Sequence, residues 1–195
     1  MSQSYVIRVS ASVKETVNAK DKRTKSLVLT EIVPADEQRE ILGALLREQG
    51  WEEDEESGVF RKTTGAVTET IDLENMTHEA SVELERSLER ERTITVRGDL
   101  DFDNPDERRK KEEAALERSL AIGEDEKSDA KDDMQREIAE ALDEGEEERT
   151  QALNELVQGV YSESLKRKAN KLGTVTSIQE SREGGDYELI IQITE

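Results

Sequence analysis

The chain has 195 residues, of which 33% are hydrophobic and 39% are charged, and its formal net charge at pH 7 is −20. Aromatic residues make up only 3%, so the core must be built from Val, Ile and Leu in regular elements. The negative charge disfavours direct binding to nucleic acid, and the absence of cysteine excludes disulfides, thiolate nucleophiles and sulfur-ligated zinc.

The beginning of the chain is predicted to form a β-hairpin. Apolar side chains alternate with polar ones over residues 5–13 and again over residues 27–33, a period typical of half-buried strands. The charged segment 20–25 lies between these two stretches and is interpreted as the turn.

The next segments predict one helix and further antiparallel strands. Residues 35–49 carry apolar side chains at helical spacing and end before Gly50. Residues 58–63 and 67–73 predict a second hairpin, with Gly65 in its turn. The apolar residues of segment 80–97 occupy even positions, which favours a strand over the helix that its composition would also allow.

The second half of the chain is predicted to be helical up to a final hairpin. A short helix is expected over residues 106–122, followed by a polar break at 123–133. A second helical pattern begins at Met134 and runs to about residue 172, with an interruption at 145–149. Residues 174–195 predict a hairpin with a Gly-Gly turn.

This order of elements predicts an α+β fold, in which an antiparallel sheet made of hairpins is packed against helices. Three segments are expected within what is interpreted as one domain. Residues 1–98 hold a hairpin, a helix and antiparallel strands, residues 99–150 form an acidic helical insertion, and residues 151–195 add a helix and a hairpin that completes the sheet.

The acidic insertion is the most unusual segment, with 21 acidic and 9 basic residues between positions 99 and 150. It allows three interpretations: a solvated face, a surface that docks on a basic protein, or an acidic mimic of nucleic acid. An apolar stripe runs along the helices of this region and beyond, and it is the candidate partner interface. Its members are Met134, Ile138, Leu142, Leu153, Leu156 and Val160.

Residues that would support catalysis or cofactor binding are scarce. His78 is the sole histidine and is expected to lie on the surface or in a turn, and no phosphate-binding glycine loop is present. Asp99, Asp101, Asp103 and Asp106 resemble the start of a calcium loop, but the glycine and glutamate that such a loop needs are missing. We therefore expect no cofactor, no metal and no enzymatic activity.

A family resemblance is carried by the two ends of the chain. The segments YVIRVSASV and YSESLKRKANKLGTVTSIQES, with the final hairpin, resemble uncharacterised α+β partner proteins of bacterial gene systems that encode FtsH-type AAA+ proteases and MoxR-type ATPases. The resemblance implies an accessory subunit of an ATPase-linked assembly, and it assigns no functional residue.

The sequence thus favours a cytoplasmic protein-binding module whose partner is an AAA+ ATPase or protease. The alternative is an acidic mimic that sequesters a DNA-binding protein. Membrane insertion is not expected, because the chain has no apolar run of about 18 residues.

Overall fold

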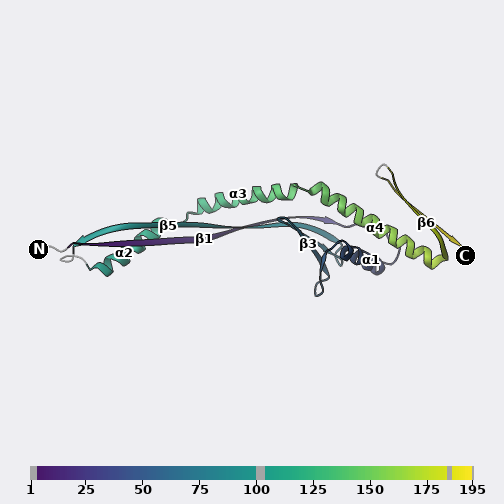
Figure 1. The fold of residues 1–195 in the computed structure, drawn as a ribbon, viewed down its shortest axis with the longest axis horizontal. Helices are drawn as coiled ribbons and strands as arrows, with labels where there is room; N and C mark the ends of the chain where they lie inside the picture. The colour runs from purple at the N-terminus through teal and green to yellow at the C-terminus, as the bar shows by residue number, and fades with distance from the viewer. Residues whose placement is uncertain (1–3, 100–103, 184–185, 195) are drawn as a thin grey trace. The chain divides into compact units, whose positions relative to one another are not determined.

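The computed structural model of the chain describes residues 4–99, 104–183 and 186–194, and these residues confirm the predicted α+β class (Figure 1). The helices are α1 (Ala35–Glu48), α2 (Pro105–Leu120), α3 (Glu124–Asp143) and α4 (Glu146–Leu172). The strands are β1 (Ser4–Ser26), β2 (Glu52–Asp54), β3 (Val59–Thr64), β4 (Val67–Asp72), β5 (Thr77–Asp99), β6 (Thr174–Glu183) and β7 (Asp186–Thr194).

The strands form two separate antiparallel sheets. The main sheet has the order β1-β5-β4-β3-β2, and β6 pairs with β7 in a second sheet of two strands. The final hairpin therefore exists as predicted but does not complete the main sheet. Only Gly173 separates α4 from β6, so the hairpin folds back and packs against α4 instead.

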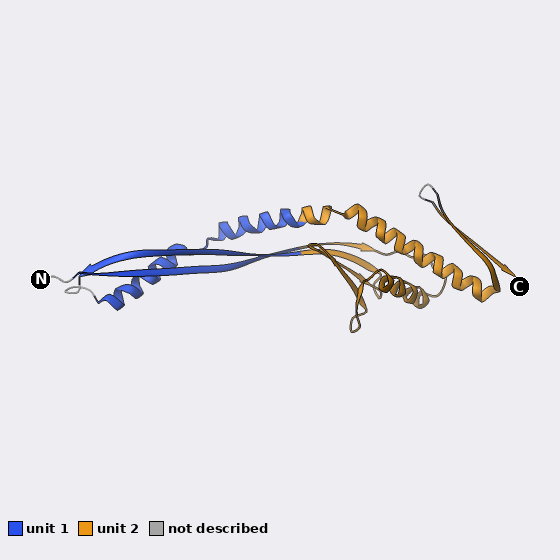
Figure 2. Ribbon diagram, viewed as in Figure 1, with its two compact units in different colours: residues 1–20, 83–138 blue, residues 21–82, 139–195 orange. Residues whose placement is uncertain are grey.

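Two compact units divide the chain, and each is made of two segments (Figure 2). Unit 1 comprises residues 1–20 and 83–138, and unit 2 comprises residues 21–82 and 139–195. The long strands β1 and β5 each contribute to both units, and so does α3.

Strand β1 is one continuous strand, so the prediction of a hairpin within the first 33 residues is wrong. The alternation does not stop at residue 13, because Val17 and Ala19 continue the buried face that includes Val9 and Ala11. Charged residues alone do not turn a strand, and residues 14–26 contain no Gly or Pro. The strand that pairs with β1 is β5.

Segment 80–97 lies within strand β5, so the strand predicted from its two-residue apolar period is confirmed, although its composition favours a helix. Near its end, Gly98 allows the ring of Tyr5 on β1 to cross the backbone. A Cβ atom at Gly98 would lie only 2.3 Å from Cζ of Tyr5. Glycine at this position therefore makes room for an aromatic side chain on the neighbouring strand.

Two helices of unit 1 pack on this pair of strands. Leu116 and Leu120 of α2 form a cluster with Val9 and Ala11 of β1. Ion pairs hold α3 along the same strands, and they join Lys127 to Glu15, Arg90 to Glu126 and Arg86 to Glu137.

Helix α3 begins at Glu124, so the polar break predicted at 123–133 is wrong. Acidic residues in a first helical turn interact favourably with the helix dipole. Ala130 lies four residues before Met134 and is also buried, so the buried stripe of α3 begins before Met134. The interruption predicted at 145–149 occurs slightly earlier. Gly145 has a left-handed backbone conformation with φ of 73°, and α4 starts at the next residue.

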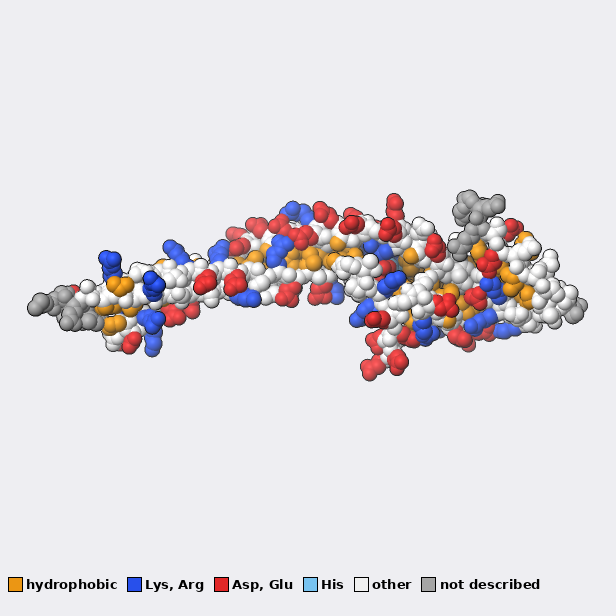
Figure 3. Space-filling view, in the orientation of Figure 1, with side chains coloured by type: hydrophobic (Ala, Val, Ile, Leu, Met, Phe, Trp, Pro, Cys, Tyr) orange, Lys and Arg blue, Asp and Glu red, His pale blue; other side chains and the backbone are white. Residues whose placement is uncertain are grey.

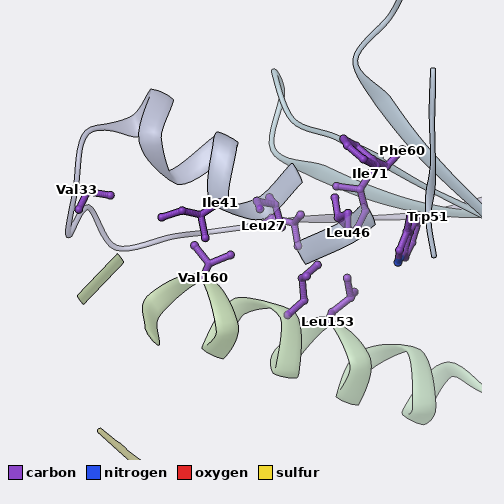
Figure 4. Close-up of a cluster of buried hydrophobic side chains, with 11 residues drawn as sticks. Leu27, Val33, Ile41, Leu46, Trp51, Phe60, Ile71, Leu153 and Val160 are labelled. Atoms are coloured by element: carbon purple, nitrogen blue, oxygen red, sulfur yellow. The ribbon is translucent and has the colours of Figure 1, made fainter. Parts of the chain in front are cut away.

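Unit 2 is organised around an apolar core between α1, α4 and the main sheet (Figure 4). Predicted elements α1 and the β3–β4 hairpin are confirmed, and both supply core residues. The core consists of Leu27, Val33, Ile41, Leu42, Leu46, Trp51, Phe60, Ile71, Leu153, Leu156 and Val160. Gly159 marks the close approach of the two helices, because a Cβ there would lie 3.1 Å from Cδ1 of Leu45.

The turn between β4 and β5 depends on the carboxylate of Asp72. It accepts hydrogen bonds from the backbone N–H groups of Asn75 and Glu74, at 2.9 and 2.8 Å, and from Nδ2 of Asn75 at 2.8 Å. These bonds, chiefly the one from the Asn75 N–H, lower the pKa of Asp72 below its usual value of 3.8.

We expect an Asp72→Asn variant to be less stable than the parent chain at pH 7. A carboxyl group whose folded-state pKa is lowered adds stability above its unfolded pKa, and this contribution is lost as pH falls through the folded pKa. The difference in unfolding free energy between the two proteins should therefore shrink as pH falls below 3.8. Urea unfolding at a series of pH values tests this, with Glu74→Gln as the control. A difference that does not vary with pH would contradict it.

Candidate interaction surface

The α3 part of the predicted interface stripe is buried within the chain itself. Met134, Ile138 and Leu142 are each at most 1% exposed, and Ala130 continues the same spacing. This cover was not predicted, because residues 5–13 were interpreted as a short hairpin strand. Strand β1 instead continues to Ser26, and Val17 and Ala19 lie on its buried face.

The α4 part of the stripe lies in the core of unit 2. Leu153, Leu156 and Val160 belong to the cluster shared with α1 and the sheet, and Figure 4 shows Leu153 and Val160 pointing toward it. A partner would therefore have to displace the chain's own contacts to reach any of the six predicted interface residues. That these residues bind a partner stays a prediction.

Most of the exposed large apolar side chains lie at the C-terminal end of α4 and on the final hairpin (Figure 3), and the exceptions among the described residues are Val6 and Val28. We call this set the C-terminal apolar patch, and its exposed fractions range from 37% to 64%. Its members are Leu165 and Leu172 of α4 and, on the hairpin face toward α4, Ile178 and Ile193, whereas Ile190 is exposed on the opposite face. Leu165 and Leu172 are seven residues apart and share one helix face.

The hairpin presents its more apolar face to α4. Glu180 on this face forms an ion pair with Lys166 of α4 at 2.8 Å and accepts a longer hydrogen bond from Ser162. The bond to Glu180, with a second one to Glu163, raises the pKa of Lys166. The strand register places Ile178 opposite Ile191 on the same face.

A β-bulge enlarges this apolar face. The register shifts between Val175 and Ser177, so Val175 and Ile178 both come to the side that faces α4. The contribution of β6 to this face was not predicted, because a bulge interrupts the simple period of two that marks a strand face.

The sole histidine is buried, so the expectation of a surface or turn histidine is wrong. His78 lies on the same buried face of β5 as Ala80 and Val82. Its Nε2 atom is 2.9 Å from Oε2 of Glu69. The cavity beside it measures about 10 Å³ and has room for about one water molecule. A small-molecule substrate does not fit there.

A group of charged side chains lies next to His78, where α4 begins. Arg23 and Lys25 of β1 both pair with Glu146, and Arg149 donates to the backbone oxygens of Leu142 and Glu144. The pKa of Glu146 is lowered, chiefly by its hydrogen bond from Lys25. These contacts fix the start of α4 on the sheet, which is a structural role.

Acidic side chains cover the outer surface of α3 and the beginning of α4 (Figure 3). Several of them are matched by bases, including Glu126, Glu137, Asp143 and Glu146. Others on α3 form no ion pair with a described residue, and these include Asp125, Asp129 and Asp132. The mixture is less uniform than the row of phosphates along a nucleic acid strand.

Within the described ranges, no group of three or more His, Asp or Glu residues is placed to hold a metal ion. Asp101 and Asp103 of the calcium-like segment lie outside the described residues. Of the helices described, none has the combination of length and apolar character needed to cross a membrane.

Comparison with known proteins gives one finding. A family model described as FtsH ternary system domain X5 matches residues 1–194. No curated protein and no solved structure matches the chain. The family match confirms the resemblance to partner proteins of FtsH-type gene systems and extends it from the two ends to the whole chain.

Proposed function

Because the chain belongs to the FtsH ternary system domain X5 family, we propose that it is a non-enzymatic accessory component of an FtsH-associated assembly. It acts by binding a protein partner, and that partner is the FtsH-type protease or ATPase of the same system. The family match over nearly the full length supports the association.

The observation that carries the protein-binding role is the C-terminal apolar patch. Exposed Leu and Ile side chains that occur together mark interaction sites more often than scattered ones do. Here they occupy one end of α4 and a two-stranded sheet whose opposite edges are both without a third strand among the described residues. The charged surface around the patch supplies a polar rim, which is the usual composition of an interface.

An acidic mimic of nucleic acid is the competing function. The exposed acids of α3 favour it, and the ion pairs that neutralise part of the same surface count against it. The two functions differ in what they predict for competition. Duplex DNA should displace the chain from a DNA-binding protein, and it should have no effect on a complex with an FtsH-type ATPase.

A double variant tests the role of the patch. Replacing both Leu165 and Leu172 by Gln preserves helix propensity while removing apolar surface from one face of α4. We expect tagged variant protein to recover much less of the FtsH-type protein of its own system than the parent chain does, measured by pull-down and quantitative mass spectrometry.

The matched control is Val28→Gln, which removes an apolar side chain that is 82% exposed and lies outside the patch. This control should recover the partner as the parent chain does. Circular dichroism confirms that both variants are folded. Equal recovery by the double variant and the parent chain would show that the patch is not the binding surface.

A further inference from the structure

Strand β7 has an open edge. Among the described residues it pairs only with β6, so its other side offers a row of backbone N–H and C=O groups without a neighbouring strand. An isolated two-stranded hairpin is only marginally stable in water, and α4 packs against one face of this one. The edge is therefore a site where another strand would add stability.

The two edges of the hairpin differ in a way that selects β7. Strand β6 contains the bulge between Val175 and Ser177, and a bulge bends a strand and interrupts a regular ladder. Natural proteins use bulges and charges to protect edges from pairing. Strand β7 has no bulge, and its centre is the apolar run Leu189, Ile190 and Ile191.

The sequence of β7 is complementary to itself in the antiparallel direction. If Ile190 lies opposite Ile190 of a second copy, Leu189 pairs with Ile191 and Tyr187 pairs with Ile193. Glu188 then faces Gln192, so no like charges lie opposite each other. In a parallel in-register pair, Glu188 would lie beside its own copy, which is destabilising.

We propose that β7 pairs edge to edge with β7 of a second copy of this chain, antiparallel and centred on Ile190. The two hairpins then form one four-stranded sheet, β6-β7-β7-β6, related by a two-fold axis. Ile190 is 43% exposed on the face away from α4, and its own copy covers it in this arrangement. The apolar faces that pack on the two copies of α4 become continuous.

The absence of cysteine in the chain makes a direct test possible. The full-length parent chain should have twice the 22.1 kDa mass of one copy in light scattering after size exclusion. An Ile190→Cys variant should form a disulfide-linked or short-bismaleimide-linked dimer under mild conditions. The control is Gln179→Cys, because Gln179 is opposite Ile190 on β6 and shares its face. This control should give little linked dimer.

A second pair of variants tests the same edge without cross-linking. Ile190→Lys places like charges opposite each other and should convert the dimer to a monomer, while Gln179→Lys should leave it dimeric. Circular dichroism establishes that the variants keep their fold. A parent chain that is monomeric at the highest soluble concentration overturns the proposal. So does a dimer in which the two cysteine variants cross-link equally or neither does.

Discussion

An Ile138→Asp variant is expected to lose more than about 4 kcal/mol of unfolding free energy in unit 1, to which Ile138 belongs. Ile138 has no exposed surface and lies in the middle of the buried stripe of this helix. A carboxylate placed there would be desolvated without a matching base, which is among the most destabilising changes that a core position can undergo.

The control for this variant is Gln135→Asp, which adds the same side chain on the exposed side of the same helix and should change stability by about 0.5 kcal/mol or less. Hydrogen exchange over residues 134–142 provides a second measurement on a verified monomer. Strong protection in the parent chain, lost in Ile138→Asp, is the expected result. Rapid exchange in the parent would contradict the burial of this stretch by the chain's own contacts.

A Phe60→Ala variant should destabilise unit 2 by about 3–5 kcal/mol. Phe60 has no exposed surface, belongs to the core between α1, α4 and the sheet, and has the Arg47 guanidinium 5.4 Å from its ring centre. Its removal would leave a cavity that the surrounding Leu and Ile side chains fill only in part, in a core with few other aromatic residues.

Val28→Ala is the matched control, because it removes apolar atoms that are already in contact with water. Urea unfolding followed by circular dichroism should show a large fall in midpoint for Phe60→Ala and almost none for the control. Similar small shifts for both variants would contradict the assignment of Phe60 to the core.

Period and turn residues were sufficient to predict α1, the β3–β4 hairpin, β5 and the final hairpin. In each case the pattern lies within one element, and local chemistry sets its limits, as Gly65 does with its φ of 61°. The strand at β5 was the hardest of these, because its Glu, Arg and Leu residues favour a helix. Pairing with β1 and β4 outweighs that preference.

The predictions that failed depend on tertiary contacts. A charged segment was interpreted as a turn within β1 although the strand passes through it, since β5 supplies a partner along both halves. Residues 123–133 were interpreted as a polar break, yet α3 begins at Glu124 and ion pairs to β1 and β5 hold its first turns. His78 was expected at the surface, and its burial depends on Glu69 of the neighbouring strand.

The position of the candidate interaction surface also depends on tertiary contacts. The apolar stripe from Met134 to Val160 was predicted to be a partner interface, and the structure buries its six side chains within the chain. That they bind a partner stays a prediction. What remains exposed is the C-terminal apolar patch, which depends on the bulge in β6 and on how the hairpin packs against α4.

Binding of the purified chain to the purified FtsH-type protein of its own gene system tests the proposed function most directly. Isothermal titration or interferometry should give a dissociation constant in the micromolar range or tighter, which corresponds to about −8 kcal/mol. Excess duplex DNA should leave the affinity unchanged, and the Leu165→Gln, Leu172→Gln double variant should weaken it. No binding at protein concentrations near 100 μM, a standard free energy weaker than about −5.5 kcal/mol, would contradict the account.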